Sequence, residues 1–259
     1  MNHQNMLKYI KEGLLNFVFP LNCKVCGKPI RESRGYSICE DCFKTIKLIE
    51  NPYCKKCGKP LIGTGFFLNN KDILCINCRK QHSYFDCARS VGVYEKALRK
   101  CIHLFKYYRE KKLAKPLGKL LIDYLSKNKQ LYQELDLIIP VPLHKNDLKI
   151  RGFNQSLLLS KEIGDYFSLP VEKDILIKKK ITGAQIKLSK KEREKNLLNA
   201  FFIAEPERIK GKKLLLIDDV FTTGSTVNEC SKELKKAQVK NICVLTLARG
   251  ISEPVTVFP

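Results

Sequence analysis

The sequence predicts an α/β protein that carries a small Cys₄ zinc-ribbon module at its N-terminal end. Four Cys-x-x-Cys pairs lie within residues 23–78, strand and helix patterns alternate from about residue 84, and one apolar run leads into two adjacent aspartates. Such alternation is typical of a mostly parallel sheet flanked by helices. We therefore expect three parts: an N-terminal amphipathic helix over residues 1–19, a double zinc ribbon over 20–83, and an α/β domain over 84–259.

Composition argues against a transmembrane helix. The chain has 259 residues, 44% of them hydrophobic, which suffices for a buried core. It contains no run of about 18 apolar residues, so we expect no transmembrane segment. Leu14–Leu21 is interrupted by Asn16 and Pro20, and no small-residue cleavage site follows it. Met6–Phe19 instead has the spacing of an amphipathic helix that ends at Pro20, and we expect a cytoplasmic protein.

The net charge favours anionic partners. The chain has 48 Lys and Arg against 26 Asp and Glu, a formal net charge of +22. An excess of this size favours phosphorylated metabolites or nucleic acid, and a lysine-rich solvated surface is the alternative interpretation.

The cysteines of residues 23–78 have the spacing of zinc ligands. A Cys-x-x-Cys turn directs two thiolates at one point, and two such turns complete a tetrahedral site. Disulfides would need an oxidising compartment, and a redox motif would account for one pair rather than four. Four cysteine ligands leave no open position for water, so two structural Zn²⁺ sites are expected. The predicted ligands are Cys23, Cys26, Cys39, Cys42, Cys54, Cys57, Cys75 and Cys78.

The ligands allow more than one pairing. Pairing the first pair with the second and the third with the fourth is simplest, and a crossed arrangement is the alternative. Gly27 and Gly58 each begin a Gly-Lys-Pro sequence after the second cysteine of a pair, which indicates two ribbons in tandem. His82 is a weaker alternative ligand. The cysteines expected to be single buried thiols are Cys87, Cys101, Cys230 and Cys243.

Residues 84–259 alternate between strand and helix patterns. Short apolar runs bounded by turn residues predict strands, and apolar residues three or four apart predict helices. The expected strands are Ser90–Tyr94, Leu137–Pro142, Ile175–Ile177, Phe201–Ile203, Leu214–Ile217 and Ile242–Leu247. The expected helices are Ala97–Tyr108, Leu113–Ser126, Ser156–Phe167 and Val227–Ala237. The apolar face expected for the third helix consists of Leu157, Leu158, Ile163 and Phe167.

The most informative segment is Leu214–Thr226. An apolar strand leads into Asp218 and Asp219, and a hydroxyl-rich turn around Gly224 then opens a helix. The first N–H groups of a helix are unpaired and its dipole favours an anion, so the turn is a candidate phosphate site. Carboxylates instead accept hydrogen bonds from hydroxyl groups or bind Mg²⁺. A sugar phosphate is therefore the expected ligand, whereas a plain capped junction would leave the adjacent acids unexplained.

This segment resembles the signature with which type I phosphoribosyltransferases bind phosphoribosyl pyrophosphate (PRPP). The resemblance implies that PRPP binds together with Mg²⁺, and that Asp218 and Asp219 bind the ribose hydroxyl groups as the catalytic pair. Enzymes of this class that act on 6-oxopurines have an acid at the position of Thr222, so purine salvage is not expected and the acceptor is unidentified. The residues implied to cradle the 5′-phosphate are Thr222, Thr223, Gly224, Ser225 and Thr226.

A second resemblance covers nearly the whole chain. Phe19-Pro20, Leu104–Tyr107 and above all Pro140–His144 with Arg151–Gln155 resemble the ComF competence family. Residues 185–188, 193, 196, 200–201 and 247–249 resemble it as well. ComF proteins combine an N-terminal zinc ribbon with a phosphoribosyltransferase-like domain. The resemblance implies a role in DNA uptake during natural transformation, with single-stranded DNA and other DNA-uptake proteins as partners.

The segment His144–Gln155 leaves one predicted strand and enters a helix. It carries several cations beside that helix N-terminus, where an anion is favoured. In the transferase fold the corresponding loop receives pyrophosphate. The alternative is that Arg151 pairs with a carboxylate and Asn154 caps the helix. The residues implied in the pyrophosphate loop are His144, Arg151, Asn154 and Gln155.

Two functions fit these motifs. The first is a Mg²⁺-dependent phosphoribosyltransferase, a glycosyltransferase that acts by positioning and electrostatics on an unidentified acceptor. The second is a non-catalytic PRPP-binding adaptor that handles single-stranded DNA. The net charge and the aromatic-basic run Phe105–Arg109 favour the second, although Phe105 also fits a helix core. The lysine-rich segment Lys178–Lys195 fits either a lid over the site or a contact with nucleic acid.

Overall fold

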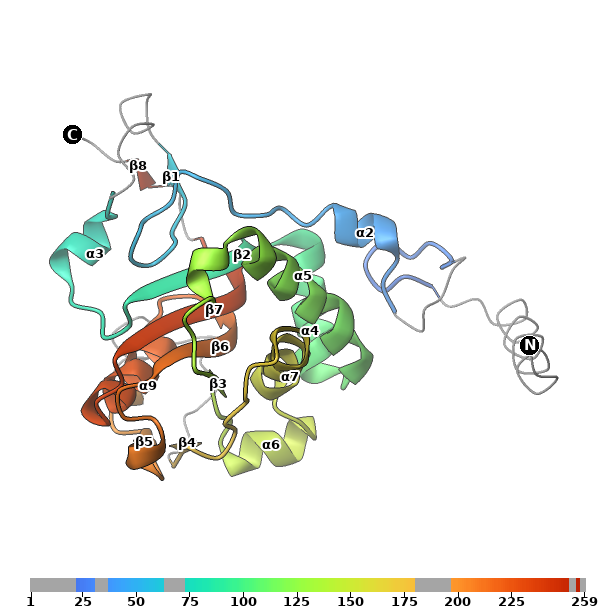
Figure 1. Ribbon diagram of the computed structural model, residues 1–259. Coiled ribbons are helices and arrows are strands. Elements are labelled where there is room, and N and C mark those ends of the chain that lie inside the picture. The colour runs from blue at the N-terminus through green and yellow to red at the C-terminus, as the bar shows by residue number, and fades with distance from the viewer. Residues whose placement is uncertain (1–21, 31–36, 63–72, 180–196, 252–254, 257–259) are drawn as a thin grey trace.

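The computed structural model describes residues 22–30, 37–62, 73–179, 197–251 and 255–256. The helix predicted over residues 1–19 and most of Lys178–Lys195 lie outside the described residues. The described chain forms two small cysteine modules and one α/β domain (Figure 1). None of the described helices has the length and apolar character needed to span a bilayer.

A four-stranded, wholly parallel sheet organises the α/β domain (Figure 1). In spatial order its strands are β2 (Cys87–Val93), β7 (Asn241–Arg249), β6 (Lys213–Phe221) and β3 (Leu137–Pro140). The run Leu214–Ile217 is buried throughout, as a strand covered on both faces requires. Because the strands are parallel, their carboxyl ends meet at one edge of the sheet, which is where such sheets bind ligands.

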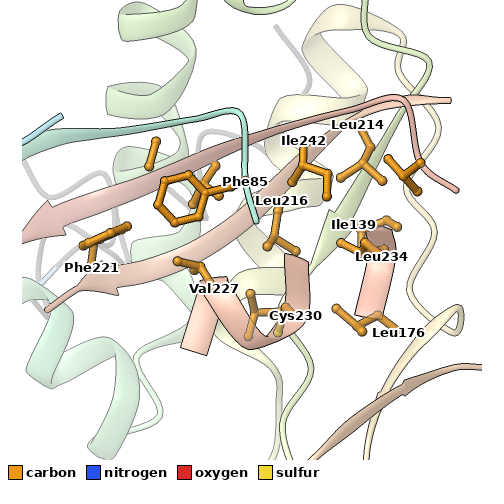
Figure 2. Close-up of a cluster of buried hydrophobic side chains, with 14 of the residues drawn as sticks. Phe85, Ile139, Leu176, Leu214, Leu216, Phe221, Val227, Cys230, Leu234 and Ile242 are labelled. Carbon is orange, nitrogen blue, oxygen red and sulfur yellow. The ribbon is translucent and has the colours of Figure 1, made fainter. Parts of the chain in front are cut away.

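Helices cover both faces of this sheet. On one face lie α4 (Lys96–Tyr107), α5 (Ala114–Lys127) and α7 (Gln155–Phe167). On the other face lie α9 (Ser225–Lys236) and an antiparallel pair, β4 (Leu176–Lys178) with β5 (Phe201–Ile203). Figure 2 shows the core on this second face, where Leu214 and Leu216 of β6 pack with Val227 and Leu234 of α9.

The remaining elements are short. One helix, α6 (Lys145–Arg151), lies between β3 and α7. The cysteine modules contain α2 (Glu40–Lys44), β1 (Leu61–Ile62) and α3 (Ile76–Lys80), and β1 pairs in parallel with β8 (Val255–Thr256). Within the described residues the 3₁₀ helices are η2 (Lys111–Leu113), η3 (Lys129–Leu131) and η5 (Pro206–Arg208).

Every strand and helix predicted within residues 84–259 is present, and the ends of several differ by a few residues, as in β3, which ends at Pro140 rather than at Pro142. The strand predicted to end at Ile217 continues through both aspartates to Phe221. The segment predicted as a loop contains α6, which buries none of its residues and so shows no apolar periodicity. On α7 only Ile163 of the predicted apolar face is buried. The buried residues of α7 are Gln155, Ser156, Leu159, Ser160, Ile163 and Gly164.

The two cysteine modules have the same local backbone geometry. The N–H of Gly27 donates to the carbonyl of Cys23, and the N–H of Gly58 donates to the carbonyl of Cys54, both at 2.8 Å. An antiparallel bridge closes each turn at the equivalent position. The structure therefore confirms the predicted tandem repeat.

The second cysteine module docks on the outer strand β2. The N–H of Ala88 donates to the carbonyl of Lys56 at 2.8 Å, and Nη1 of Arg89 donates to the carbonyl of Lys55 at 2.9 Å. Arg89 also lies over the ring of Tyr53, 4.8 Å from its centroid. The buried cysteines of this module belong to the same apolar cluster as the inner strands. The module is thus continuous with the core of the α/β domain.

The segment between the modules covers the free edge of β2. The N–H of Ile49 donates to the carbonyl of Val91, and the N–H of Val93 donates to the carbonyl of Lys47, both at 2.9 Å. An open sheet edge exposes unpaired backbone groups, and this segment satisfies them. The first cysteine module packs against the other face, where Cys23 joins the cluster of α4 and α5.

We predict that Gly58→Ala destabilises the protein more than Gly27→Ala. Both glycines have positive φ, +68° and +74° respectively, so each substitution costs about 1–2 kcal/mol in backbone strain. At Gly58 the new Cβ would also lie 2.6 Å from the carbonyl oxygen of Ala88, whereas at Gly27 it meets open space. Overpacking costs about 1–3 kcal/mol more. Denaturant unfolding measures the difference, and equal losses would contradict the docking on β2.

Candidate functional site

The two predicted acids lie together near the carboxyl end of β6. Asp219 is 6% exposed and faces α4, and Asp218 is half-buried. Oδ1 of Asp218 accepts hydrogen bonds from Oγ of Ser156 at 3.1 Å and from the N–H of Asp219 at 2.9 Å. Because Ser156 lies in the first turn of α7, this contact joins the start of α7 to β6.

Lys106, near the end of α4, forms a salt bridge with Asp219. Its Nζ lies 2.8 Å from Oδ1 of Asp219, and the two side chains are only 19% and 9% exposed. Burial alone would lower the pKa of Lys106, but the carboxylates of Asp219 and Asp218 outweigh it and the pKa is raised. The sequence alone did not indicate that Lys106 contacts the acid pair. The available signal was a lysine directly following the apolar stripe that ends at Phe105.

The pKa of Asp218 is raised to about 7. Burial is the largest cause and the charge of Asp219 is the second, whereas Lys106 and the bonds from Asp219 and Ser156 act in the opposite direction. Lys178 of β4 and Cys230 of α9 also lie within electrostatic reach of Asp218. The acid pair therefore lies near two cations, Lys106 of α4 and Lys178 of β4.

The predicted phosphate loop follows directly. Gly224 has φ +83°, and a Cβ there would lie 2.4 Å from the ring of Phe221, so only glycine fits. The hydroxyls of Thr223 and Ser225 are 2.7 Å apart, and the N–H of Ser225 donates to Oγ1 of Thr223 at 3.3 Å. Thr222 and Thr223 are exposed, and Ser225 and Thr226 begin α9, whose first turn presents N–H groups that have no acceptor within the helix.

The residues predicted to bind pyrophosphate form hydrogen bonds within the protein. Nδ1 of His144 accepts from the N–H of Asn146 and caps α6. Oδ1 of Asn154 accepts from the first N–H groups of α7, so the capping alternative is confirmed for Asn154. Gln155 is 1% exposed and accepts from Nη1 of Arg151 at 3.3 Å.

Arg151 does not pair with a carboxylate among the described residues. Its guanidinium lies over the ring of Tyr107 at 5.4 Å, and Asn154 Nδ2 donates to the carbonyl of Val141 at 3.0 Å. These contacts hold the segment after β3 against the end of α4, next to the acid pair.

The eight predicted metal ligands form two sets of four in sequential order. Within each set the sulfur atoms all lie within 4.8 Å of one another. The Sγ–Sγ distances are 3.7 Å for Cys23–Cys42, 3.8 Å for Cys26–Cys39 and 3.7 Å for Cys57–Cys75. A tetrahedron with Zn–S bonds of about 2.3 Å has edges of about 3.8 Å, so both sets fit zinc.

Backbone groups support the same interpretation. Sγ of Cys23 accepts the N–H of Val25 at 3.4 Å and of Cys39 at 3.3 Å, and Sγ of Cys54 accepts the N–H of Cys75 at 3.3 Å. Such donors stabilise thiolate ligands. His82 belongs to neither set and instead contacts the ring of Tyr84.

Two of the remaining cysteines are not single buried thiols. Cys87 and Cys243 are register partners on β2 and β7, both half-buried, with Sγ atoms 3.0 Å apart. The prediction was wrong for this pair because the two cysteines are brought together by the order of the strands in the sheet. That order cannot be predicted from the sequence of either strand. Cys101 and Cys230 are 0% exposed, as predicted.

Fold and site together define a phosphoribosyltransferase-type domain preceded by a double zinc ribbon. Comparison with family models agrees, because residues 14–79 match the double zinc ribbon domain and residues 154–256 match the phosphoribosyl transferase domain. The chain is 34% identical over 240 residues to competence protein F of Haemophilus influenzae, which covers 92% of this chain and 100% of that protein. The chain belongs to the ComF family.

Two further relatives span almost the whole chain. The DNA utilization protein YhgH of Escherichia coli K12 is 28% identical over 231 residues, covering 88% of this chain and 97% of its own length. Competence protein ComFC of Streptococcus pneumoniae is 27% identical over 248 residues, covering 88% of this chain and 100% of its own.

We predict that the acid pair makes stability fall with rising pH. The pKa of Asp218 is about 7 in the folded protein against an ordinary 3.8, so between these values the folded state binds more protons than the unfolded state. The free energy of unfolding therefore decreases as pH rises through this window. Denaturant unfolding of wild type and Asp218→Asn across the window measures the effect. Asp218→Asn should show a smaller decrease, and parallel profiles would contradict the assignment.

Proposed function

We propose that the chain binds PRPP with Mg²⁺ at the carboxyl edge of the sheet and acts as a competence protein in the handling of incoming DNA. One observation carries the first part: an acid pair, one member of which is paired with Lys106, lies on the same strand that leads into the turn at the start of α9. The second part rests on the family, whose members in Haemophilus influenzae and Streptococcus pneumoniae are named competence proteins.

The acid pair suits the ribose of PRPP. Asp218 and Asp219 offer carboxylate oxygens that accept hydrogen bonds from the two ring hydroxyl groups. PRPP is strongly anionic, and two carboxylates beside it would repel it. Lys106, 2.8 Å from Asp219, compensates one of these charges within a site that excludes most water. We therefore assign Lys106 to the site as the group that keeps the acid pair compatible with an anionic ligand.

The loop Thr222–Thr226 suits the 5′-phosphate. The N–H groups at the start of α9 and the helix dipole favour an anion, and the exposed hydroxyls of Thr222 and Thr223 add donors. The loop begins one residue after β6 ends and three residues after Asp219, so a ligand can reach both at once. This proximity matches a phosphate and a pair of hydroxyl groups on one ribose.

The pyrophosphate of PRPP is assigned to the segment His144–Gln155. Arg151 is the cation of this segment that lies beside α4, while Asn154 and Gln155 maintain its shape. Mg²⁺, when bound, would supply further charge neutralisation on the pyrophosphate. In a transfer reaction the bond between the ribose C1 and pyrophosphate breaks and the acceptor forms the new bond, so stabilising the departing charge is the task of this segment.

The proposal predicts that Asp218→Asn and Asp219→Asn weaken PRPP binding. Each loses a charge-assisted hydrogen bond to ribose, which corresponds to about 1.5–3 kcal/mol of binding free energy. Asp123→Asn, an exposed acid on α5, is the matched control and should bind like wild type. Calorimetric titration with PRPP and Mg²⁺ measures the change. Unchanged affinity in both site variants would defeat the ribose assignment. Release of pyrophosphate in the same samples, with water as the acceptor at ribose C1, would indicate catalysis in addition to binding.

An adaptor that handles single-stranded DNA is a second candidate, favoured by an aromatic surface at the end of α4. Tyr107 and Tyr108 are 48% and 61% exposed, and both rings contact His103. Arg109 is exposed beside them and donates to the carbonyl of Ile150 at 2.9 Å. Exposed rings interleaved with cations are typical of platforms on which bases stack.

Only the second half of the aromatic-basic run belongs to this surface. Phe105 is 0% exposed and Lys106 faces Asp219, so neither is available to nucleic acid. The surface therefore adjoins the acid pair through successive residues of α4. DNA bound there would lie next to the proposed PRPP site.

This candidate predicts that Tyr108→Ala weakens binding to single-stranded DNA by about 1–3 kcal/mol, because one stacked base is lost. Arg109→Ala should reduce the slope of log affinity against log salt by about 0.7, the value for one phosphate contact on a single strand. Tyr166→Ala, which removes an exposed ring on α7, is the control. Fluorescence anisotropy with a labelled oligothymidine across a salt series measures both effects. Wild-type affinity in Tyr108→Ala would rule the surface out.

A further inference from the structure

Arg249 is a buried cation that touches the second cysteine site. It is the last residue of β7 and is 5% exposed. Its Nη1 donates to the carbonyl oxygen of Cys57 at 2.5 Å, and its Nη2 donates to Sγ of the same cysteine at 3.4 Å. Cys57 is one of the four residues whose sulfur atoms form the second site. A guanidinium from the carboxyl edge of the sheet is therefore in direct contact with the metal site.

The same guanidinium also contacts the residue before the phosphate loop. It lies over the ring of Phe221, 4.3 Å from the centroid. That ring fills the space beside Gly224, where a Cβ would lie 2.4 Å from it. The N–H of Gly250 donates to the carbonyl of Phe221 at 2.9 Å, so the end of β6 is tied to the residue after Arg249 as well. The position of the Phe221 ring thus limits how the turn at Gly224 can be arranged.

Electrostatic attraction favours the contact between Arg249 and the second cysteine site. Four thiolates around Zn²⁺ carry a net negative charge, and a buried guanidinium needs a counter-charge. The Nε of Arg249 has no hydrogen-bond partner among the described residues, so its contacts with Cys57 and Phe221 carry its stabilisation. A pocket of about 460 Å³ adjoins all three parts, since Cys57, Arg249, Phe221 and Gly224 line it. Water can therefore reach this junction if the contacts loosen.

We propose that Arg249 couples metal binding at the second cysteine site to the arrangement of the loop Thr222–Thr226. Arg249 is then a positioning residue: metal in the site holds the guanidinium, the guanidinium holds the Phe221 ring, and the ring holds the turn at Gly224. The first cysteine site packs on α4 instead. In so far as PRPP is the ligand of the loop, this inference rests on the proposed function.

Coupling of this kind is reciprocal. If metal in the second site favours the loop arrangement that binds PRPP, then bound PRPP must strengthen metal retention by the same factor. An arginine that only docks the cysteine module on the sheet would show no such effect. Reciprocity therefore separates positioning from a merely structural role.

The first experiment follows the loop without any ligand. Hydrogen exchange of the amides of Thr222–Thr226 is measured in the full-length zinc-loaded protein for wild type, Arg249→Met and Arg89→Met. Arg89 is the matched control, because it also anchors the second module through a carbonyl and a ring but belongs to β2 and contacts Tyr53 rather than Phe221. We expect exchange in Arg249→Met to be faster by at least about fivefold and in Arg89→Met to match wild type. Equal exchange in all three proteins overturns the coupling.

The second experiment tests reciprocity by following the zinc of the second site. Cys26→Ser removes a ligand of the first site, so the zinc of the second site can be followed alone in this variant. Zinc release to a colorimetric chelator is measured with and without PRPP and Mg²⁺. We expect PRPP to slow the release by at least about fivefold, and to have no effect when Arg249→Met is added. Release that is unchanged by bound PRPP overturns the coupling.

The two experiments distinguish failure of this inference from failure of the proposed function. If calorimetry shows that PRPP does not bind wild type, the proposed function fails, and hydrogen exchange alone decides the coupling. If Arg249→Met does not fold, Arg249→Lys takes its place in the exchange experiment. Lysine keeps the charge but cannot contact Cys57 and Phe221 with one planar group, so faster loop exchange is again expected and wild-type exchange again overturns the coupling.

Discussion

The arrangement of the carboxyl edge depends on one salt bridge, between Lys106 and Asp219. Two adjacent carboxylates at a largely buried strand end repel each other. The Nζ of Lys106, 2.8 Å from Oδ1 of Asp219, offsets this repulsion. The lysine reaches them only because α4 packs along the sheet with its last turn at the carboxyl edge. The hydroxyl of Ser156 adds a contact to Asp218 and brings the start of α7 to the same place. Three elements thus meet at the acid pair.

The cysteine modules pack directly against the α/β domain. The segment between them completes the edge of β2, and the second module shares its buried residues with the core on the α9 face. In this ComF protein the second cysteine module and the phosphoribosyltransferase-type domain therefore form a continuous structure. Arg249 is the point of closest connection, since it touches Cys57 on one side and the residue before the phosphate loop on the other.

The sequence predicted those parts of the fold and site that are encoded locally. Cysteine spacing was enough to identify the ligands, and the run from Leu214 to Thr226 was enough to identify the strand, the acids and the loop. Features that depend on tertiary arrangement were missed, namely the Cys87–Cys243 pair, which strand order brings together, and the contact of Lys106 with Asp219, which depends on how α4 packs on the sheet. The helix α6 was missed for another reason, because it buries no residue and is defined by a histidine cap rather than by apolar periodicity.

The most direct test of the central claim is a crystal structure of the full chain with PRPP and Mg²⁺ bound. The account predicts ribose hydroxyl oxygens within about 2.5–3.0 Å of the carboxylates of Asp218 and Asp219. It also predicts the 5′-phosphate against the N–H groups of Thr222–Thr226, with Lys106 still within reach of the acid pair. PRPP bound away from β6, with the acid pair contacting Lys106 and no ligand atom, would contradict it.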